Sequence, residues 1–374
     1  MRGLLGMRLN ADRFKEVSLL GIIGVTAMAF SLLVDDYLSG QFFNRVTTSV
    51  VIVAVLAAGQ TMVILTRNID LSVGSIVGVT AYVTGEYLAD HPDAAPLVAV
   101  AIAMGIGLVL GLVNGSLVAY GKVPAIVVTL GTMAIYRSWL VDHSGSQSIT
   151  TDSLPDWVGD MPGRTVLSIG NLDLRLVFVI AIGVVLVLQV ALAKLRWGRR
   201  IYAVGSNPEA AQTAGLPQRR LVLGAYAACG ALSGLAGFFF LGRFGTITAS
   251  AGTGLELDAI GASVVGGVST LGGAGTMVGA FLGAILIELL DQSLGRADIV
   301  SEFWRNAILG LLILGAVLAD VAIGRRFRRR WARKAEAAVR HDDVVPVTDL
   351  AVMTDDDNDK ADPEADTAEV SSNA

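Results

Sequence analysis

Residues 194–220 read Lys-Leu-Arg-Trp-Gly-Arg-Arg-Ile-Tyr-Ala-Val-Gly-Ser-Asn-Pro-Glu-Ala-Ala-Gln-Thr-Ala-Gly-Leu-Pro-Gln-Arg-Arg. This polar stretch separates two apolar runs, each long enough to cross a membrane. Positive charge stands at both of its ends, on Lys194, Arg196, Arg199, Arg200, Arg219 and Arg220. Because segments rich in Lys and Arg stay on the cytoplasmic side of a membrane, the stretch is predicted to be a cytoplasmic loop between two spans.

The centre of the 194–220 loop carries the signals of one short helix. Ser206 or Asn207 can cap its start, and Pro208 suits its first turn. The residues that favour, stabilise or end a helix then follow in order: Glu209, Ala210, Ala211, Gly215 and Pro217. We expect a rod of about two turns that lies outside the bilayer and is anchored to a span at each end.

Two interpretations of this short helix stand side by side. As a solvated connector, it would only join two spans. As a coupling helix, it would be a rigid element that another protein binds and moves, and its motion would move the spans. A flexible connector would not need both a cap and a stop, and we therefore favour the coupling helix.

The loop also carries a spaced pattern, Gly-Arg-x-Ile/Phe-Tyr-Ala-x-Gly-x-Asn-x-x-Ala-Ala-x-x-x-Gly. The chain matches it at Gly198, Arg199, Tyr202, Ala203, Gly205, Asn207, Ala210, Ala211 and Gly215. In this pattern the chain resembles the bacterial ABC importer permeases of the ribose, xylose, rhamnose and autoinducer-2 type. The resemblance implies that an ATPase is contacted through Gly205, Asn207, Glu209, Ala210, Ala211 and Gly215.

The composition indicates a membrane protein with many spans. The chain has 374 residues, of which 53% are hydrophobic and 16% charged, and its mean hydropathy is +0.63. A soluble chain of this length would need far more charge to cover its surface. The 43 glycines fit close packing between helices, because small residues let two backbones approach.

We expect an all-α, polytopic helical bundle of about ten membrane segments. The predicted segments are residues 17–34, 46–66, 69–88, 96–119, 123–141, 176–193, 221–242, 255–271, 274–290 and 303–323. Only two or three residues separate the second segment from the third and the eighth from the ninth, and these joints hold Gly, Ser, Asn and Asp. Broken or re-entrant helices are therefore expected at both joints, with their free backbone groups satisfied inside the protein.

The distribution of Lys and Arg predicts the orientation. With the N-terminus inside, most of these residues fall in cytoplasmic segments, in agreement with the positive-inside rule. We therefore expect a protein of the bacterial cytoplasmic membrane with both termini inside. Its predicted parts are a cytoplasmic N-terminus (1–16), a transmembrane permease domain (17–324) and a cytoplasmic tail (325–374) that is first basic, then acidic and disordered.

The longest external loop is predicted over residues 142–175. Its turn-forming composition and Trp157 favour an ordered cap at the outer surface. This cap could be a docking face for an external protein or a simple connector, and the residues favour neither.

A second polar cluster lies at residues 65–75. Because a charge at mid-bilayer costs about 3 kcal/mol, Arg67 and Asp70 should stand at the cytoplasmic boundary or line a wet cavity. Asp70 and Ser72 can cap a broken helix whose positive end faces the transport pathway, and capping is the favoured role of Asp70 over solute contact. The sequence Ile-Asp-Leu-Ser-Val-Gly is also typical of the sugar permeases, and the preceding Thr-Arg-Asn is similar to their rhamnose and autoinducer-2 branches.

A third cluster runs from Gly254 to Gly275 and begins Gly-Leu-Glu-Leu-Asp-Ala-Ile. It resembles the sugar permease pattern, with Gly261 in place of the first of two paired alanines. Polar residues inside predicted spans could bond a hydroxylated solute or, with equal weight, a neighbouring helix. The residues predicted for the translocation pathway are Gln60, Asp70, Ser72, Asn114, Thr129, Thr132 and Glu256, with Glu288 and Asp291 as weaker candidates.

Nothing in the sequence resembles an enzyme active site. The three histidines stand in predicted loops without metal-ligand spacing, and no Gly-x-x-x-x-Gly-Lys-[Ser/Thr] loop is present to bind ATP phosphates. We expect no catalytic residue, no cofactor, no metal and no nucleic-acid partner. The resemblance implies a second permease copy or paralogue, separate cytoplasmic ATPase subunits, an extracytoplasmic solute-binding protein, a monosaccharide or sugar-like solute, and surrounding membrane lipid.

Two alternatives remain. An ion-coupled secondary transporter would keep ionisable residues deep in the bundle to hold the ion, and few are found here. A branched-chain amino-acid ABC permease would need charged or dipolar partners for a zwitterion. The Ile-Asp-Leu-Ser-Val-Gly signature argues against this second alternative.

Overall fold

The structure is a computed structural model that describes residues 2–297, 301, 304 and 307–318. The chain divides into two compact units, residues 1–321 and 322–374, and all described residues belong to the first. The predicted cytoplasmic tail and the end of the tenth predicted segment lie outside the described residues. Everything that follows concerns the first unit.

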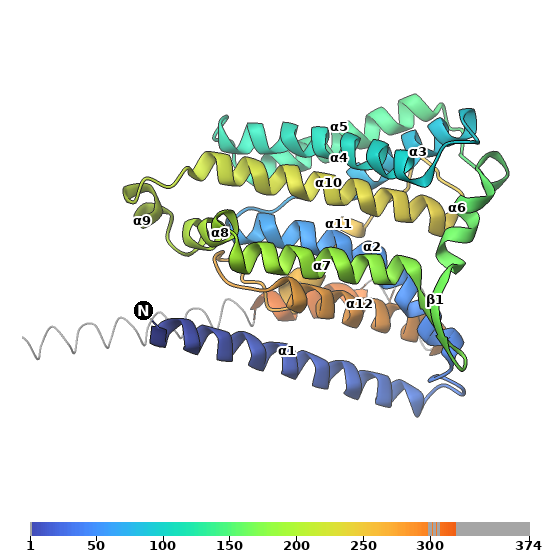
Figure 1. The fold of residues 1–374 in the computed structure, drawn as a ribbon, viewed down its shortest axis with the longest axis horizontal. Helices are drawn as coiled ribbons and strands as arrows, with labels where there is room; N and C mark the ends of the chain where they lie inside the picture. Colours follow the sequence, from blue (N-terminus) through green and yellow to red (C-terminus); the bar gives the residue numbers. More distant parts are fainter. Residues whose placement is uncertain (1, 298–300, 302–303, 305–306, 319–374) are drawn as a thin grey trace, which may run out of the picture. The chain divides into compact units, whose positions relative to one another are not determined.

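The described chain is mostly helical, which confirms the all-α prediction (Figure 1). The long helices are α1 (Arg2–Ser31), α2 (Gly40–Leu65), α3 (Val73–Asp90), α4 (Pro96–Ala119), α5 (Ala125–Ser144), α7 (Leu176–Lys194), α10 (Gln218–Phe244) and α12 (Met277–Ala297). Shorter helices are α6 (Asp156–Asp160), α8 (Arg196–Ser206), α9 (Pro208–Thr213), α11 (Leu255–Val265) and an apolar helix at Ala307–Leu318.

Six of the described helices are long and apolar enough to cross a membrane: α2, α4, α5, α7, α10 and α12. The polytopic architecture is thereby confirmed, whereas the total of about ten segments stays a prediction. Two predicted segments are shorter helices than expected. The segment predicted at 69–88 becomes helical only at Val73, and the one predicted at 255–271 ends at Val265.

Both predicted joints are present, and both are longer than expected. The first spans residues 66–72, where Arg67 has a φ of 67° and the polar side chains bind one another or nearby backbone groups. The second spans residues 266–276, where four glycines have positive φ angles that other residues rarely adopt. The two joints therefore end the helices by different means, a polar turn in one case and glycine conformation in the other.

The core lies around α2, whose residues from Ser49 to Leu65 are all buried. In Figure 1, α10 runs between the α4–α5 pair and α2. The contact of α10 with α4 depends on glycine. A Cβ atom at Gly107 would collide with the carbonyl oxygen of Gly230, and one at Gly230 would collide with that of Gly107. The expectation that small residues allow close helix packing is confirmed here.

The segment between α5 and α7 is ordered, as expected for residues 142–175. It contains two short 3-10 turns (Thr151–Ser153 and Met161–Gly163), α6, and an antiparallel pair of strands, β1 (Thr165–Ile169) and β2 (Leu172–Arg175). The hairpin was not predicted, although the Gly-Asn pair between its strands is a hairpin signal. In Figure 1 this segment lies at one end of the bundle and α9 at the other.

Candidate functional site: the coupling loop and the polar break

The short helix predicted in the 194–220 loop is present as α9, Pro208–Thr213. The side chain of Asn207 caps it, because its Oδ1 accepts from the backbone N–H of Ala210 at 3.0 Å. Pro208 occupies the first turn, and Glu209 is exposed beside it. The alternative cap, Ser206, is instead the last residue of α8.

The end of α9 is fixed by Gly215, whose φ of 70° lies in the left-handed region. Its N–H donates to the carbonyl of Gln212 at 2.9 Å, while the N–H of Leu216 donates to the carbonyl of Ala211 at 3.0 Å. This pair of bonds satisfies carbonyls that the helix end leaves free. The cap and the stop predicted from sequence are thus both formed, and both ends of α9 are fixed.

The helix that precedes α9 was missed by the sequence analysis. In α8, Arg196 and Arg199 are exposed, whereas Gly198, Ile201 and Gly205 are buried. Their spacing of three and four residues puts one face toward the protein, and this helical period was the signal that could have revealed α8. Because α8 has a buried face and only Asn207 separates it from α9, α8 connects α9 to the bundle.

The end of α8 meets two other segments at Gly205. A Cβ atom here would collide with the carbonyl oxygen of Leu65, the last residue of α2, and would come within 2.6 Å of the Gly273 nitrogen. The Gly273 N–H donates to the Leu65 carbonyl at 3.0 Å, and the Ser206 hydroxyl donates to the Gly273 carbonyl at 3.2 Å. Only glycine leaves room for three backbones at this point.

Arg67 also binds the end of α8. Its Nε donates to the carbonyl of Gly205 at 2.6 Å, and its Nη2 donates to the carbonyl of Ser206 at 2.9 Å. We call the set Leu65, Arg67, Gly205, Ser206 and Gly273 the coupling junction. From the sequence, Arg67 was expected at the cytoplasmic boundary or in a wet cavity, but its partners could not be predicted because they are backbone groups about 140 residues away in the chain.

Four residues predicted for the pathway come together in the joint after α2. The Oδ1 of Asp70 accepts from the Ser72 N–H at 2.9 Å and from the Ser72 hydroxyl at 2.7 Å. The Asn114 amide of α4 donates to the Ser72 hydroxyl at 2.7 Å. The amide of Gln60, in the orientation that satisfies both of its atoms, pairs with the Asp70 carbonyl at 3.2 Å and the Asp70 N–H at 3.1 Å.

We call Gln60, Asp70, Ser72 and Asn114 the break network. All four are completely buried, and Tyr136 of α5 extends the network by donating to the Asn114 Oδ1 at 3.2 Å. Ser72 occupies the N-cap position of α3, but its side chain caps no helix N–H, contrary to expectation. Its backbone is helical and not extended as an N-cap residue usually is, and its hydroxyl instead donates to the Asp70 Oδ1 and accepts from the Asn114 amide.

One atom of the break network lacks a partner. The Oδ2 of Asp70 is buried and accepts no hydrogen bond from any described residue. A buried carboxylate oxygen without a donor is unfavourable, and such an orphan calls for an explanation such as an unbound ligand or an ordered water. Asp70 therefore holds the turn with one oxygen, while its other oxygen has no donor among the described residues.

The remaining pathway candidates lie outside the network. Thr129 and Thr132 are buried in α5 and donate to the backbone, Thr129 to the Ala125 carbonyl at 2.9 Å and Thr132 to the Thr129 carbonyl at 3.4 Å. Glu256 is half-buried in the first turn of α11, where its Oε2 lies against Gly74 of α3. The weaker candidates Glu288 and Asp291 are half-buried on α12.

A bundle of apolar helices, a buried polar break and a capped rod at one end together define a multi-spanning membrane transport protein. The chain belongs to the family described as "Branched-chain amino acid transport system / permease component", whose model matches residues 42–317. It is therefore a transport component and not an enzyme, as the resemblance in the coupling loop implied.

Curated relatives support this assignment. The chain is 37% identical over 309 residues to the autoinducer 2 import system permease protein LsrC of Salmonella paratyphi B, covering 80% of this chain and 85% of the relative. It is 36% identical over 303 residues to the proteins of the same name from Shigella flexneri and Escherichia coli K12, covering 80% of this chain and 86% of each relative. No solved structure gives a significant match.

Proposed function

We propose that the chain is the membrane-spanning subunit of an ABC importer that carries autoinducer 2 or another small sugar-like solute into the cell. The observation that carries this proposal is the similarity, over 80% of the chain, to permeases named for autoinducer 2 import. The capped rod α9 supports it physically, because a permease without its own ATP site needs a rigid element through which a separate ATPase can act.

The proposed assembly has a second permease copy or paralogue, two cytoplasmic ATPases that hold α9 of each permease, and a solute-binding protein outside. The chain then lies in the bacterial cytoplasmic membrane with both termini inside. In this orientation the ordered segment with α6 and the β1–β2 hairpin faces outward, where the binding protein would dock. Helix α9 and this outward-facing segment lie at opposite ends of the bundle, as an importer requires (Figure 1).

The proposed motion passes through the coupling junction. When ATP closes the ATPases, α9 moves, and α8 moves with it because only Asn207 separates the two helices. The Gly205 and Ser206 carbonyls at the end of α8 are held by Arg67, which lies three residues before Asp70. A shift of α8 therefore pulls directly on the turn that contains the break network.

The chemistry of the break network suits an uncharged, hydroxylated solute. The free Oδ2 of Asp70 is an acceptor for a solute hydroxyl, and the amides of Gln60 and Asn114 line the same turn. Such a solute needs hydrogen-bond partners and no counter-ion. We propose that Asp70 contacts the solute when the break opens, while its Oδ1 keeps the turn in place.

Reconstitution tests the proposed function. The permease, its neighbouring ATPase and its binding protein would be placed in vesicles, and uptake of labelled autoinducer 2 and rhamnose would be followed with and without internal ATP. ATP-dependent uptake that survives a protonophore supports the proposal. Uptake that a protonophore abolishes while ATP stays high would establish an ion-coupled transporter, and uptake competed only by leucine would establish an amino-acid permease.

The Glu209→Arg substitution tests the role of α9. Glu209 is exposed and its carboxylate forms no salt bridge or hydrogen bond with a described residue, so the variant should insert and fold normally. We expect co-purification of the ATPase and ATP-driven uptake to fall at least tenfold, since a reversed charge at an interface costs several kcal/mol in unfavourable cases and about 1.4 kcal/mol already corresponds to a factor of ten. Asp93→Arg, the same reversal in the exposed loop between α3 and α4, is the matched control. Normal co-purification and uptake of Glu209→Arg would refute the coupling assignment.

A further inference from the structure

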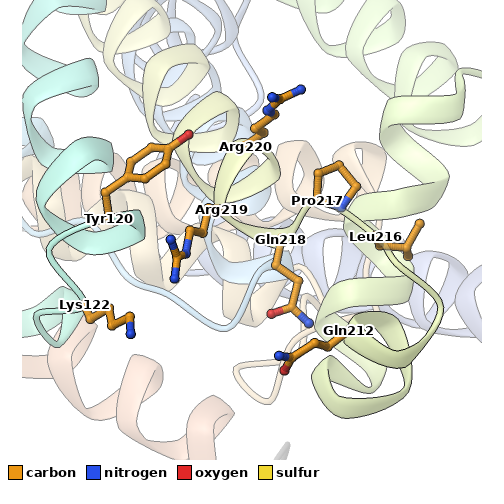
Figure 2. Close-up of a pocket in the computed structure, with 8 residues that line it drawn as sticks. All are labelled: Tyr120, Lys122, Gln212, Leu216, Pro217, Gln218, Arg219 and Arg220. Carbon is orange, nitrogen blue, oxygen red and sulfur yellow. The ribbon is translucent and has the colours of Figure 1, made fainter.

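A hollow of about 590 Å³ opens between the turn after α4, the end of α9 and the start of α10. We call it the basic hollow, because Lys122, Arg219 and Arg220 line it and no acidic residue does. All three cations are exposed, and none forms a salt bridge with a described residue. Figure 2 shows Lys122 and Arg219 on the same side, next to Tyr120, while Arg220 extends away from them.

The charge of the basic hollow is uncompensated within the described chain. The first turn of α10, which contributes both arginines, holds no acidic residue. Positive side chains gathered around one concave surface raise the local potential and attract an anion. The occupant is therefore expected to be negatively charged, and the apolar residues Leu216 and Pro217 in the lining indicate that part of it is hydrocarbon.

The surface next to the hollow indicates which kind of anion fits. Val109, Val113 and Leu117 follow one another at intervals of four residues on α4, and each is exposed. They form one apolar stripe along the helix, which ends at Tyr120 in the wall of the hollow. A tyrosine at the end of an apolar helix is typical of the membrane interface, where its ring is in lipid and its hydroxyl in water.

We propose that the basic hollow binds the phosphate of an anionic phospholipid whose acyl chains lie along the α4 stripe. A soluble protein cannot cover a stripe that lies within the bilayer, which favours lipid over an acidic face of the ATPase. The hollow, its charges and the stripe are features of the structure itself. The assignment of the lipid to the cytoplasmic leaflet, in contrast, rests on the proposed function. Basic recesses between the cytoplasmic ends of spans are established sites for anionic headgroups in membrane proteins.

Bound lipid would lie against the coupling helix. The Gln218 amide, in the wall of the hollow, donates to the Pro208 carbonyl at the start of α9. Gln212 of α9 is also part of the lining. A headgroup in the hollow would therefore contact both the start of α10 and the rod that the ATPase is proposed to grip.

Lipid retention by the full-length purified chain tests the proposal without any transport assay. The chain in detergent would be titrated with phosphatidylglycerol, with phosphatidylcholine, or with inorganic phosphate, and retained lipid would be measured by native mass spectrometry. Wild type should retain phosphatidylglycerol and little phosphatidylcholine. The Lys122→Gln/Arg219→Gln variant should bind phosphatidylglycerol about thirtyfold more weakly, since each cation near a lipid surface contributes roughly a factor of five.

The control is Lys194→Gln/Arg196→Gln, which removes the same charge from exposed residues of the same loop and should bind within about twofold of wild type. If the double variant is poorly folded, the single variant Arg219→Gln is used instead. It is expected to bind phosphatidylglycerol about fivefold more weakly than wild type. Three results would each overturn the proposal: equal weakening in both double variants, displacement of the lipid by inorganic phosphate, or unchanged lipid binding with loss of ATPase co-purification.

Discussion

Replacing Gly205 with alanine is expected to abolish most ATP-driven uptake and to destabilise the protein by about 3 kcal/mol. The added Cβ would collide with the Leu65 carbonyl oxygen and press on the Gly273 nitrogen. Both obstacles are backbone atoms, which cannot turn aside as a flexible side chain can. Relief requires α8 to move away from α2, which breaks the hydrogen bonds that Arg67 donates to Gly205 and Ser206.

A thermal unfolding midpoint and vesicle uptake, measured on the same preparation, check this expectation. Gly183→Ala is the matched control, because Gly183 lies in α7 with no atom near its missing Cβ, and alanine is a better helix former than glycine. The control should be at least as stable and as active as wild type. A Gly205→Ala protein that behaves like the control would show that the three backbones are not in tight contact at the junction.

The second large effect is expected at Asp70. Asp70→Ala removes the acceptor of two hydrogen bonds from Ser72 and leaves buried polar groups unsatisfied. Each unsatisfied group costs about 1–3 kcal/mol, so the variant should be strongly destabilised and should import almost nothing. Protein yield, unfolding temperature and uptake would measure this loss.

Asp70→Asn separates the two roles proposed for this residue. Asparagine keeps one oxygen to accept from Ser72, so the fold should stay close to wild type, but an amide NH2 replaces the free Oδ2. If that oxygen contacts the solute, half-saturation of uptake should require about tenfold more solute, as loss of a charged hydrogen bond predicts. Ser72→Ala, which disturbs the turn and spares Oδ2, is the control. Wild-type affinity in Asp70→Asn would leave Asp70 only with its role of holding the turn through Ser72.

Local signals predicted the short helix α9 well. A cap residue, a proline in the first turn and a glycine after the end are separate features of a few neighbouring residues, and Asn207, Pro208 and Gly215 act in the structure as expected. The same local logic placed a break near Asp70. It also gave Ser72 a capping role that the structure does not bear out, because the helical backbone of Ser72 and its bond from Asn114, far away in the chain, cannot be predicted from neighbouring residues.

Features that depend on residues far apart in the chain could not be predicted from the sequence. The break network needs Asn114 of α4 beside Ser72 and Tyr136 of α5 beside Asn114, and one sequence does not show which polar residues of different helices meet. The role of Arg67 was missed for the same reason, since its partners are backbone carbonyls of α8. By contrast, the helical period of α8 and the Gly-Asn turn of the hairpin were visible in the sequence and were overlooked.

The central claim is that the coupling junction transmits the force of ATP hydrolysis from α9 to the break. The most direct measurement is the number of solute molecules imported per ATP hydrolysed by the reconstituted importer with Arg67→Ala, compared with Arg200→Ala, an exposed arginine of α8. The account predicts that Arg67→Ala keeps ATP hydrolysis while this ratio falls about tenfold, a coupling loss near 1.4 kcal/mol. A folded Arg67→Ala importer with the wild-type ratio would contradict the account.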